Sequence, residues 1–142
     1  MSLFRSWKQS LFGVALGAFI ASGCASTSQI TVRSTSRTND GNTLYMMVRA
    51  VDRVDAAEDY QSVASRLFAN PPDSSVISSQ PIFPGQPIEV KLDDADKRNI
   101  VIYFFFTDHG ANWRVPLRKP LPSEVFIDLG NQQIERIQVK RR

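Results

Sequence analysis

The chain has 142 residues with a formal charge of +3, eight prolines, seven glycines and a single cysteine. This length suffices for one domain of ordinary size and is too short for two. Every Asp and Glu follows Cys24, whereas Arg5 and Lys8 precede it, so residues 24–142 carry 15 basic and 14 acidic residues, a charge of about +1. The basic residues alternate with acidic ones except in the terminal run 140–142, which is typical of a solvated tail, so the composition argues against a nucleic-acid-binding face.

The first 23 residues show the three parts of a secretory signal peptide. A basic stretch without acidic residues precedes an apolar run at 11–21, which is shorter than the about 20 residues that a membrane-spanning helix needs. Small residues follow, and the sequence Ala-Ser-Gly-Cys at 21–24 resembles the lipobox of bacterial lipoproteins. The resemblance implies cleavage before Cys24, diacylglycerol on its thiol and usually an acyl chain on the new amine.

Lipid on Cys24 would fix the protein to a membrane, because each buried CH₂ contributes about 0.8 kcal/mol and two or more chains give stable anchoring. The alternative is cleavage near the same place with Cys24 left as a free thiol, which invites unwanted disulfides in an oxidising compartment. Ala25 follows the cysteine, where Asp would resemble the inner-membrane retention signal of enteric bacteria. We therefore expect the periplasmic face of the outer membrane.

Beyond the cysteine, small polar residues at 24–29 predict a short tether, and the folded domain is expected to span 30–142. Alternating β-branched residues predict a first strand at 30–36. The Asn-Asp-Gly-Asn sequence at 39–42 is a strong turn signal, because these residues accept positive φ angles at low cost. The next strand is predicted at 44–51.

A short helix is expected after this strand. Asp55 and Glu58 have the spacing of a capping box, with a side-chain acceptor followed three residues later by a carboxylate. Apolar residues then recur at the spacing of one helical face, and prolines at 71 and 72 end the pattern. This face is formed by Tyr60, Val63, Ala64, Leu67 and Phe68.

The remainder of the chain reads as short strands and turns. The segment 100–107 is apolar on both faces, which indicates a strand buried from both sides or lying under the helix. Seven or eight short strands at intervals of about ten residues predict an all-β fold, a two-sheet β-sandwich of immunoglobulin-like type with one short helical insertion. The further strands are expected at 76–78, 82–83, 88–92, 113–115, 124–129 and 133–139.

The residues needed for common catalytic or metal sites are few. His109 is the only histidine and falls in a predicted hairpin turn, so a zinc site of the His/Cys type has no ligand set and a Ser-His-Asp arrangement would have to use this residue. Asp93, Asp94 and Asp96 form an acidic cluster, but it lacks the glycine and distal glutamate of an EF-hand, so a solvated loop is expected. We predict a protein that is not an enzyme and binds no cofactor.

The order of these features resembles the outer-membrane lipoprotein family of the type VI secretion system, called TssJ or SciN. That family also has a lipobox cysteine, a short tether, two early strands, a helical insertion, a Pro-Gly turn and a Trp-Arg strand. The matching residues here are 44–51, Pro84, Gly85, 88–92, 100–106, Trp113 and Arg114.

The resemblance implies a transthyretin-like sandwich of two sheets. It also implies a structural adaptor that holds the periplasmic part of the large inner-membrane protein TssM at the outer membrane, and it allows several copies in a ring. In that family the loop joining the first two strands is important for the contact. The corresponding residues here are Arg37, Thr38, Asn39, Asp40, Gly41 and Asn42. A plain hairpin turn is the alternative interpretation of this segment.

Two further functions remain open. One is a lipoprotein accessory of another envelope machine, such as a pilotin, a type IV secretion component or an outer-membrane assembly factor. The other is a periplasmic sandwich that binds carbohydrate or another ligand. The latter needs an exposed aromatic platform, for which Trp113 and Tyr45 are the candidates, and burial of both would argue against it.

Overall fold

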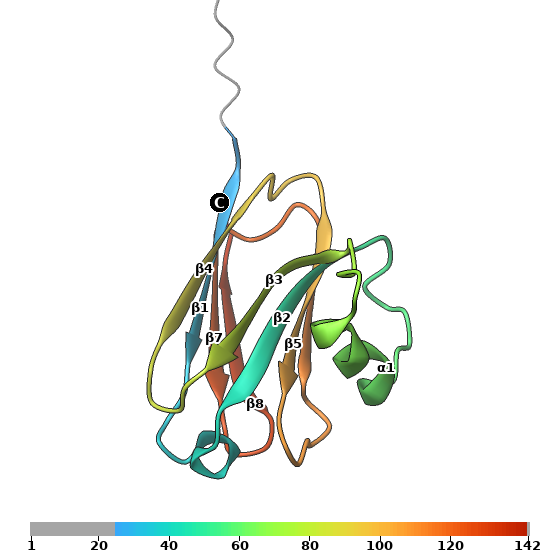
Figure 1. Ribbon diagram of the computed structural model, residues 1–142. Helices are drawn as coiled ribbons and strands as arrows, with labels where there is room; N and C mark the ends of the chain where they lie inside the picture. Colours follow the sequence, from blue (N-terminus) through green and yellow to red (C-terminus); the bar gives the residue numbers. More distant parts are fainter. Residues whose placement is uncertain (1–24, 142) are drawn as a thin grey trace, which may run out of the picture.

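Two four-stranded sheets pack face to face around the side chains that alternate along their strands (Figure 1). This computed structural model describes residues 25–141, so the signal segment 1–23 and Cys24 lie outside the described residues. The two-sheet β-sandwich predicted from the sequence is confirmed. The strands are β1 (Thr27–Arg33), β2 (Leu44–Val51), β3 (Val76–Ile82), β4 (Ile88–Asp93), β5 (Asn99–Phe105), β6 (Arg114–Leu117), β7 (Glu124–Leu129) and β8 (Ile134–Lys140).

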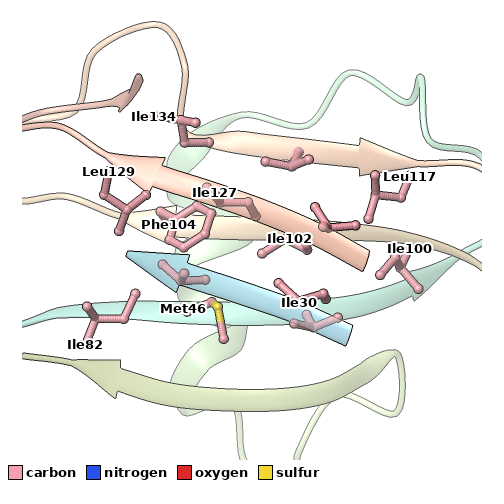
Figure 2. Packing of buried hydrophobic residues seen from close by; sticks show 14 of the residues in the cluster. Ile30, Met46, Ile82, Ile100, Ile102, Phe104, Leu117, Ile127, Leu129 and Ile134 are labelled. Carbon is pink, nitrogen blue, oxygen red and sulfur yellow. The ribbon is translucent and has the colours of Figure 1, made fainter. Parts of the chain in front are cut away.

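The sheets have the strand orders β4-β1-β7-β8 and β3-β2-β5-β6. Strand β1 pairs antiparallel with β4 and parallel with β7, while β2 pairs antiparallel with both β3 and β5. The core lies between the sheets and consists of aliphatic and aromatic side chains from both inner faces (Figure 2). Its members include Ile30, Met46, Ile82, Ile100, Ile102, Phe104, Leu117, Ile127, Leu129 and Ile134.

The first strand begins three residues earlier than the sequence predicts and ends earlier as well. Within the segment expected as a tether, Ser28 is fully buried and its hydroxyl donates to Pro122 O at 2.6 Å. The amide of Gln29 donates to Ser123 O at 2.9 Å. Because backbone pairing with β4 and β7 holds this segment, small polar side chains do not prevent it from being a strand, and the folded domain begins at 27 instead of 30.

One continuous strand, β3, replaces the two short strands expected at 76–78 and 82–83. Pro81 lies within it opposite Tyr45 of β2. A proline is tolerated here because β3 is an edge strand, so its missing N–H falls on the side without a partner strand.

The helical insertion also starts later than expected. Its helices are α1 (Tyr60–Ala64) and η2 (Ser65–Phe68), and Asp59 caps α1 by accepting a hydrogen bond from Ser62 N at 2.9 Å. The capping box predicted at Asp55 and Glu58 is wrong, because these carboxylates form ion pairs instead, with Arg118 and Arg49. Hydrogen bonds from Ser62 lower the pKa of Asp59.

The insertion covers the outer face of the β3-β2-β5-β6 sheet and makes a second small core there. Val63 of α1 is fully buried against Met47, Val101 and Tyr103. Strand β5 is therefore buried on both faces, as its continuous apolar sequence predicts. The last residue of the predicted helical face departs from the pattern, since Phe68 is 75% exposed.

A buried arginine links the insertion to the sheet. Arg49 of β2 is 6% exposed, and its guanidinium donates to Glu58 Oε2 and to Ser75 Oγ, each at 2.9 Å. The hydroxyl of Tyr103 donates to the same Glu58 oxygen at 3.1 Å. Charge-assisted hydrogen bonds of this kind compensate for moving a cation out of water.

A second arginine of the same network connects the two ends of the insertion. Arg66 of η2 forms ion pairs with Glu58 and Asp73. Hydrogen bonds from the hydroxyl and amide of Ser75, followed by the contact with Arg66, hold the pKa of Asp73 well below its usual range. Two ends of one segment, 58 and 73–75, are thereby fixed to β2 and to each other.

Replacing Glu58 tests this link. In Glu58→Gln the Arg49 cation stays buried without a negative partner, and we expect the free energy of unfolding to fall by about 2–3 kcal/mol. Urea denaturation monitored by tryptophan fluorescence measures the change. The exposed pair of Asp55 and Arg118 provides the control, since Asp55→Asn is expected to change stability by less than about 1 kcal/mol. Equal effects of the two variants would contradict the role given to the buried pair.

Candidate functional site

Four loops form one end of the sandwich, here called the distal end. They are the β1–β2 loop (34–43), the β3–β4 loop (83–87), the β5–β6 loop (106–113) and the β7–β8 loop (130–133). In Figure 1 the start of β1 is at the top, whereas the short helix η1 (Thr38–Gly41) within the β1–β2 loop is at the bottom. The described chain therefore begins at the end opposite to the loop for which the sequence predicts a partner contact.

The β1–β2 loop is not a hairpin turn, because β1 and β2 belong to different sheets. It crosses from one sheet to the other through three consecutive residues with positive φ, namely Asn39 at 52°, Asp40 at 54° and Gly41 at 79°. Asn, Asp and Gly are the residues that adopt this left-handed region most readily. The turn signal in the sequence is thus confirmed in its position, while the hairpin interpretation is wrong.

Asn39 is the centre of the loop and is almost fully buried. Its side-chain oxygen accepts a hydrogen bond from Thr107 N at 2.8 Å, and its side-chain amide donates to the carbonyl oxygens of Asn42 and Thr43 at 3.1 and 3.2 Å. Its backbone N–H donates to Asn131 O at 2.7 Å. The side chain and backbone of this one residue thus join three of the four distal loops.

Further contacts hold the same loop against β7 and the β7–β8 loop. The carboxylate of Asp40 accepts a hydrogen bond from the side-chain amide of Asn131 at 2.7 Å. The backbone N–H of Asp40 in turn donates to the side-chain oxygen of Asn131, also at 2.7 Å. The buried hydroxyl of Thr38 donates to Leu129 O at 3.2 Å. A loop held by so many hydrogen bonds presents its exposed atoms in a defined position, which lowers the entropy lost on binding.

The six predicted contact residues therefore divide into two groups. Thr38 and Asn39 are buried and shape the loop. The exposed members are Arg37, Asp40, Gly41 and Asn42.

Exposed aromatic side chains near the distal end were not predicted as part of the site. Tyr45 at the start of β2 and Phe68 at the end of η2 are 37% and 75% exposed, and their ring centroids lie 5.7 Å apart at 82°. Phe83 in the β3–β4 loop is 50% exposed. Exposed aromatic side chains on a rigid frame are frequent anchors of protein interfaces. The only hint in the sequence is their position beside turn and helix ends.

Beside them lies a more buried aromatic cluster. His109 is exposed and stacks on the Tyr60 ring at 3.9 Å, and Trp113 meets Tyr60 edge-on at 5.0 Å. The Tyr60 hydroxyl donates to Phe106 O at 2.6 Å, and burial raises its pKa. Burial, followed by the charge of Glu58, likewise raises the pKa of Tyr103.

The arrangement gives little support to an aromatic ligand platform. Trp113 is half-buried and takes part in the cluster under the insertion, whereas Tyr45 is exposed. The burial of both residues, which would have argued against ligand binding, is therefore not observed. The perpendicular rings of Tyr45 and Phe68 nevertheless do not form the flat surface on which a sugar ring stacks.

The remaining candidate residues are placed apart from this end or engaged in local contacts. In the acidic cluster, Asp94 pairs with Lys97, and the amide of Asp96 binds Ser26 Oγ at 3.1 Å, near the start of β1. Within residues 25–141 no group of three or more His, Cys, Asp or Glu side chains could hold a metal ion. Over the same range, no helix is long and apolar enough to cross a membrane.

Comparison with known proteins gives a family match. The model of the family described as "IglE, N-terminal domain" matches residues 45–129, from β2 to the end of β7. No curated protein shows a significant match to the chain.

Solved structures share the fold. The type VI secretion lipoprotein TssJ1 from Pseudomonas aeruginosa has a TM-score of 0.62 at 14% identity, covering 83% of this chain and 98% of that chain. Lip, a membrane-bound type VI secretion component of Serratia marcescens, has a TM-score of 0.61 at 17% identity, covering 80% and 98%. A chain in the structure of the type VI secretion protein TssM C-terminal domain from EAEC gives 0.60 at 15% identity, covering 79% and 97%. The resemblance predicted from the sequence is confirmed at the level of the fold.

Removing the Asn39 side chain tests whether it organises the distal end. Asn39→Ala loses three hydrogen bonds and places a residue that disfavours positive φ at 52°, so we expect a loss of stability of about 2–3 kcal/mol and faster hydrogen exchange at Thr107 N. Asn39→Gly retains the tolerance for positive φ and should lose less. Thr43→Ala, at an exposed position of the same loop, serves as the control, and a Thr107 amide equally protected in all variants would show that Asn39 does not hold the loops together.

Proposed function

The chain belongs to the IglE N-terminal domain family, and from this premise we propose that it is a lipid-anchored structural adaptor of a type VI-like secretion complex. In this proposal lipid on Cys24 holds the chain at the periplasmic face of the outer membrane. The distal end then holds the periplasmic part of a TssM-like inner-membrane protein. The role is mechanical and requires no catalysis.

The observation that carries this proposal is that the start of the described chain and the β1–β2 loop lie at opposite ends of the sandwich. Strand β1 starts at the end of the sandwich opposite to the distal end, here called the tether end, and leads directly into the loop that contains η1 (Figure 1). Seven extended residues span roughly 23 Å at about 3.3 Å per residue. An anchor before residue 25 therefore places the distal end away from the membrane, towards a partner that approaches from the other side of the periplasm.

The surface of the distal end has the composition of a protein interface. The loop around Asp40 is polar, rigid and accessible, and Tyr45, Phe68 and Phe83 add exposed aromatic area at the same end of the sandwich. Aromatic anchors typically supply most of an interface's binding energy, and polar loops around them supply orientation. Similar folds occur in proteins described as type VI secretion lipoproteins and in a TssM structure, which supports a TssM-like partner.

The lipid anchor is tested with Cys24→Ser. We expect the wild-type chain to fractionate with the outer membrane and to incorporate radiolabelled palmitate, because lipid chains on the thiol and amine give stable anchoring. The variant should lose both properties while remaining folded, since residues 25–141 form the sandwich without Cys24. Unchanged fractionation of Cys24→Ser would rule out the anchor.

The partner contact is tested with the purified periplasmic region of the TssM-like protein from the same host. We expect Phe68→Ala and Tyr45→Ala each to weaken binding about 10-fold, or roughly 1.4 kcal/mol, through loss of buried aromatic area. Isothermal titration calorimetry gives the affinity.

Ile77→Ala is the matched control, because Ile77 is 36% exposed and lies near the start of β3, away from the distal end. Its affinity should equal that of the wild type. If the wild-type chain recovers no inner-membrane partner from solubilised envelopes, the adaptor role fails, and an accessory role in another envelope machine becomes the better explanation.

A further inference from the structure

The last strand of the fold leaves apolar side chains uncovered. Ile137 and Val139 of β8 are 45% and 50% exposed. They pair with Ile127 and Val125 of β7, which are fully buried in the core. Because directly opposite residues of an antiparallel pair point to the same face, the two β8 side chains face the inside of the sandwich and are nevertheless accessible.

The opposite sheet is too short to cover them. Strand β6, which forms the facing edge, has four residues and contains Pro116. The other open side of the sandwich differs, because there the inward residues Ile88 and Val90 of β4 are partly buried against the core and Leu92 is buried. The side between β6 and β8 is therefore the incomplete side of the fold.

A groove follows this side. One hollow of about 530 Å³ lies between β6 and β8, and a second of about 220 Å³ shares Ile137 with it and continues along β8 towards the distal end. The larger hollow is lined by residues of both strands and of the segments that follow them, among them Pro116, Leu117, Lys119, Ile137, Val139 and Arg141. Its walls are apolar along the strands and cationic at the tether end.

The N–H of Ile134 at the start of β8 donates to Asn112 O at 2.8 Å, but beyond it the outer edge of β8 has no partner strand among residues 25–141, because β8 ends the strand order. An edge strand presents unpaired N–H and C=O groups to any extended chain that arrives. Native edge strands are protected by charged side chains, by proline or by inward-pointing charge. Strand β8 carries its positive charges, Arg136 and Lys140, on the outward face, and its inward positions hold Ile137 and Val139.

We infer that the β8 edge is a docking site for an extended segment of a partner protein, which adds as a fifth strand to the β4-β1-β7-β8 sheet. Alternate apolar side chains of that segment would cover Ile137 and Val139 and close the groove. A carboxylate at the tether end of the segment would meet Lys119 and Arg141, whose side chains form no ion pair within residues 25–141. This site is separate from the distal end and extends the proposed function.

Charge favours an acidic partner over a second copy of this chain. Residues 134–141 contain Arg136, Lys140 and Arg141 but only one acidic residue, Glu135. Arg136 and Lys140 pair with carboxylates of β7, whereas Arg141 forms no ion pair within residues 25–141. Pairing two β8 edges would bring these positive charges together, and like charges on paired strands are destabilising. A segment that carries carboxylates would be attracted to these positive charges, whereas a second copy of β8 would be repelled by them.

An appended strand tests the site without knowledge of the natural partner. The probe is the sequence Asp-Asp-Val-Thr-Val-Thr-Val, joined by a flexible Gly-Ser linker to the C-terminus of the full-length chain in detergent. After the linker reverses the chain, the two Asp residues lie at the cationic end of the groove, and the tether gives an effective concentration near the millimolar range. We expect amide exchange in β8 to slow about 10-fold or more relative to a chain carrying a Gly-Ser tail only.

Two comparisons decide the result. A tail that begins Lys-Lys should protect β8 less than the acidic tail, and Ile137→Lys should remove the protection while the control Ile77→Lys, at an exposed apolar position in β3, should retain it. Equal exchange of β8 with the acidic and the Gly-Ser tails would overturn the inference. Concentration-dependent protection of β8 in the chain without a tail would identify a second copy as the occupant and equally overturn it, while leaving the distal-end contact unaffected.

Discussion

The pairing of β1 on both of its edges is the constraint on which the rest of the structure depends. Strand β1 lies between β4 and β7, so its direction is fixed by hydrogen bonds on two sides. The chain enters at one end of the sandwich and must reach η1 at the other, where Asn39 and its partners bring the distal loops together. The proposed anchor before the start of β1 would therefore give the far end of the sandwich a defined position. A flexible domain on the same tether could not hold a partner at a fixed place.

The helical insertion has a structural task that explains an otherwise unusual sequence. Because β5 is apolar on both faces, one face would be exposed to water if the sheet stood alone. The insertion covers that face with Val63 and is linked to the sheet through Arg49 and Glu58. The same placement brings Phe68 beside Tyr45 at the distal end. The one inserted segment thus both covers the sheet and contributes to the proposed contact surface.

The sequence was informative where side-chain periodicity decides structure and misleading where long-range hydrogen bonds do. The strand at 44–51 and the two-sided burial of β5 were predicted from the sequence pattern alone. The start of β1 could not be predicted, because Ser28 is held by partners near residue 122 instead of by its own polarity. The turn signal located the distal loop, but the organising role of Asn39 depends on Thr107, which is 68 residues away. The exposure of Phe68 was missed because this residue ends a helical face whose spacing, taken alone, predicts a side chain buried in the core.

The two proposed contact surfaces have different physical origins, which bears on how a complex would assemble. The distal end is closed by its own hydrogen bonds, so a partner there meets a preformed surface and loses little entropy on binding. The β8 side is open because β6 is short, and an added strand would complete the sandwich while exchanging backbone hydrogen bonds with water for bonds with the partner. The distal end would select a partner by its shape, and the β8 side would select a partner by strand pairing and charge. A single partner chain that used both, with a folded part at the distal end and an extended acidic part along β8, would be held on two sides of the same rigid body, and its second contact would form at the high effective concentration set by the first.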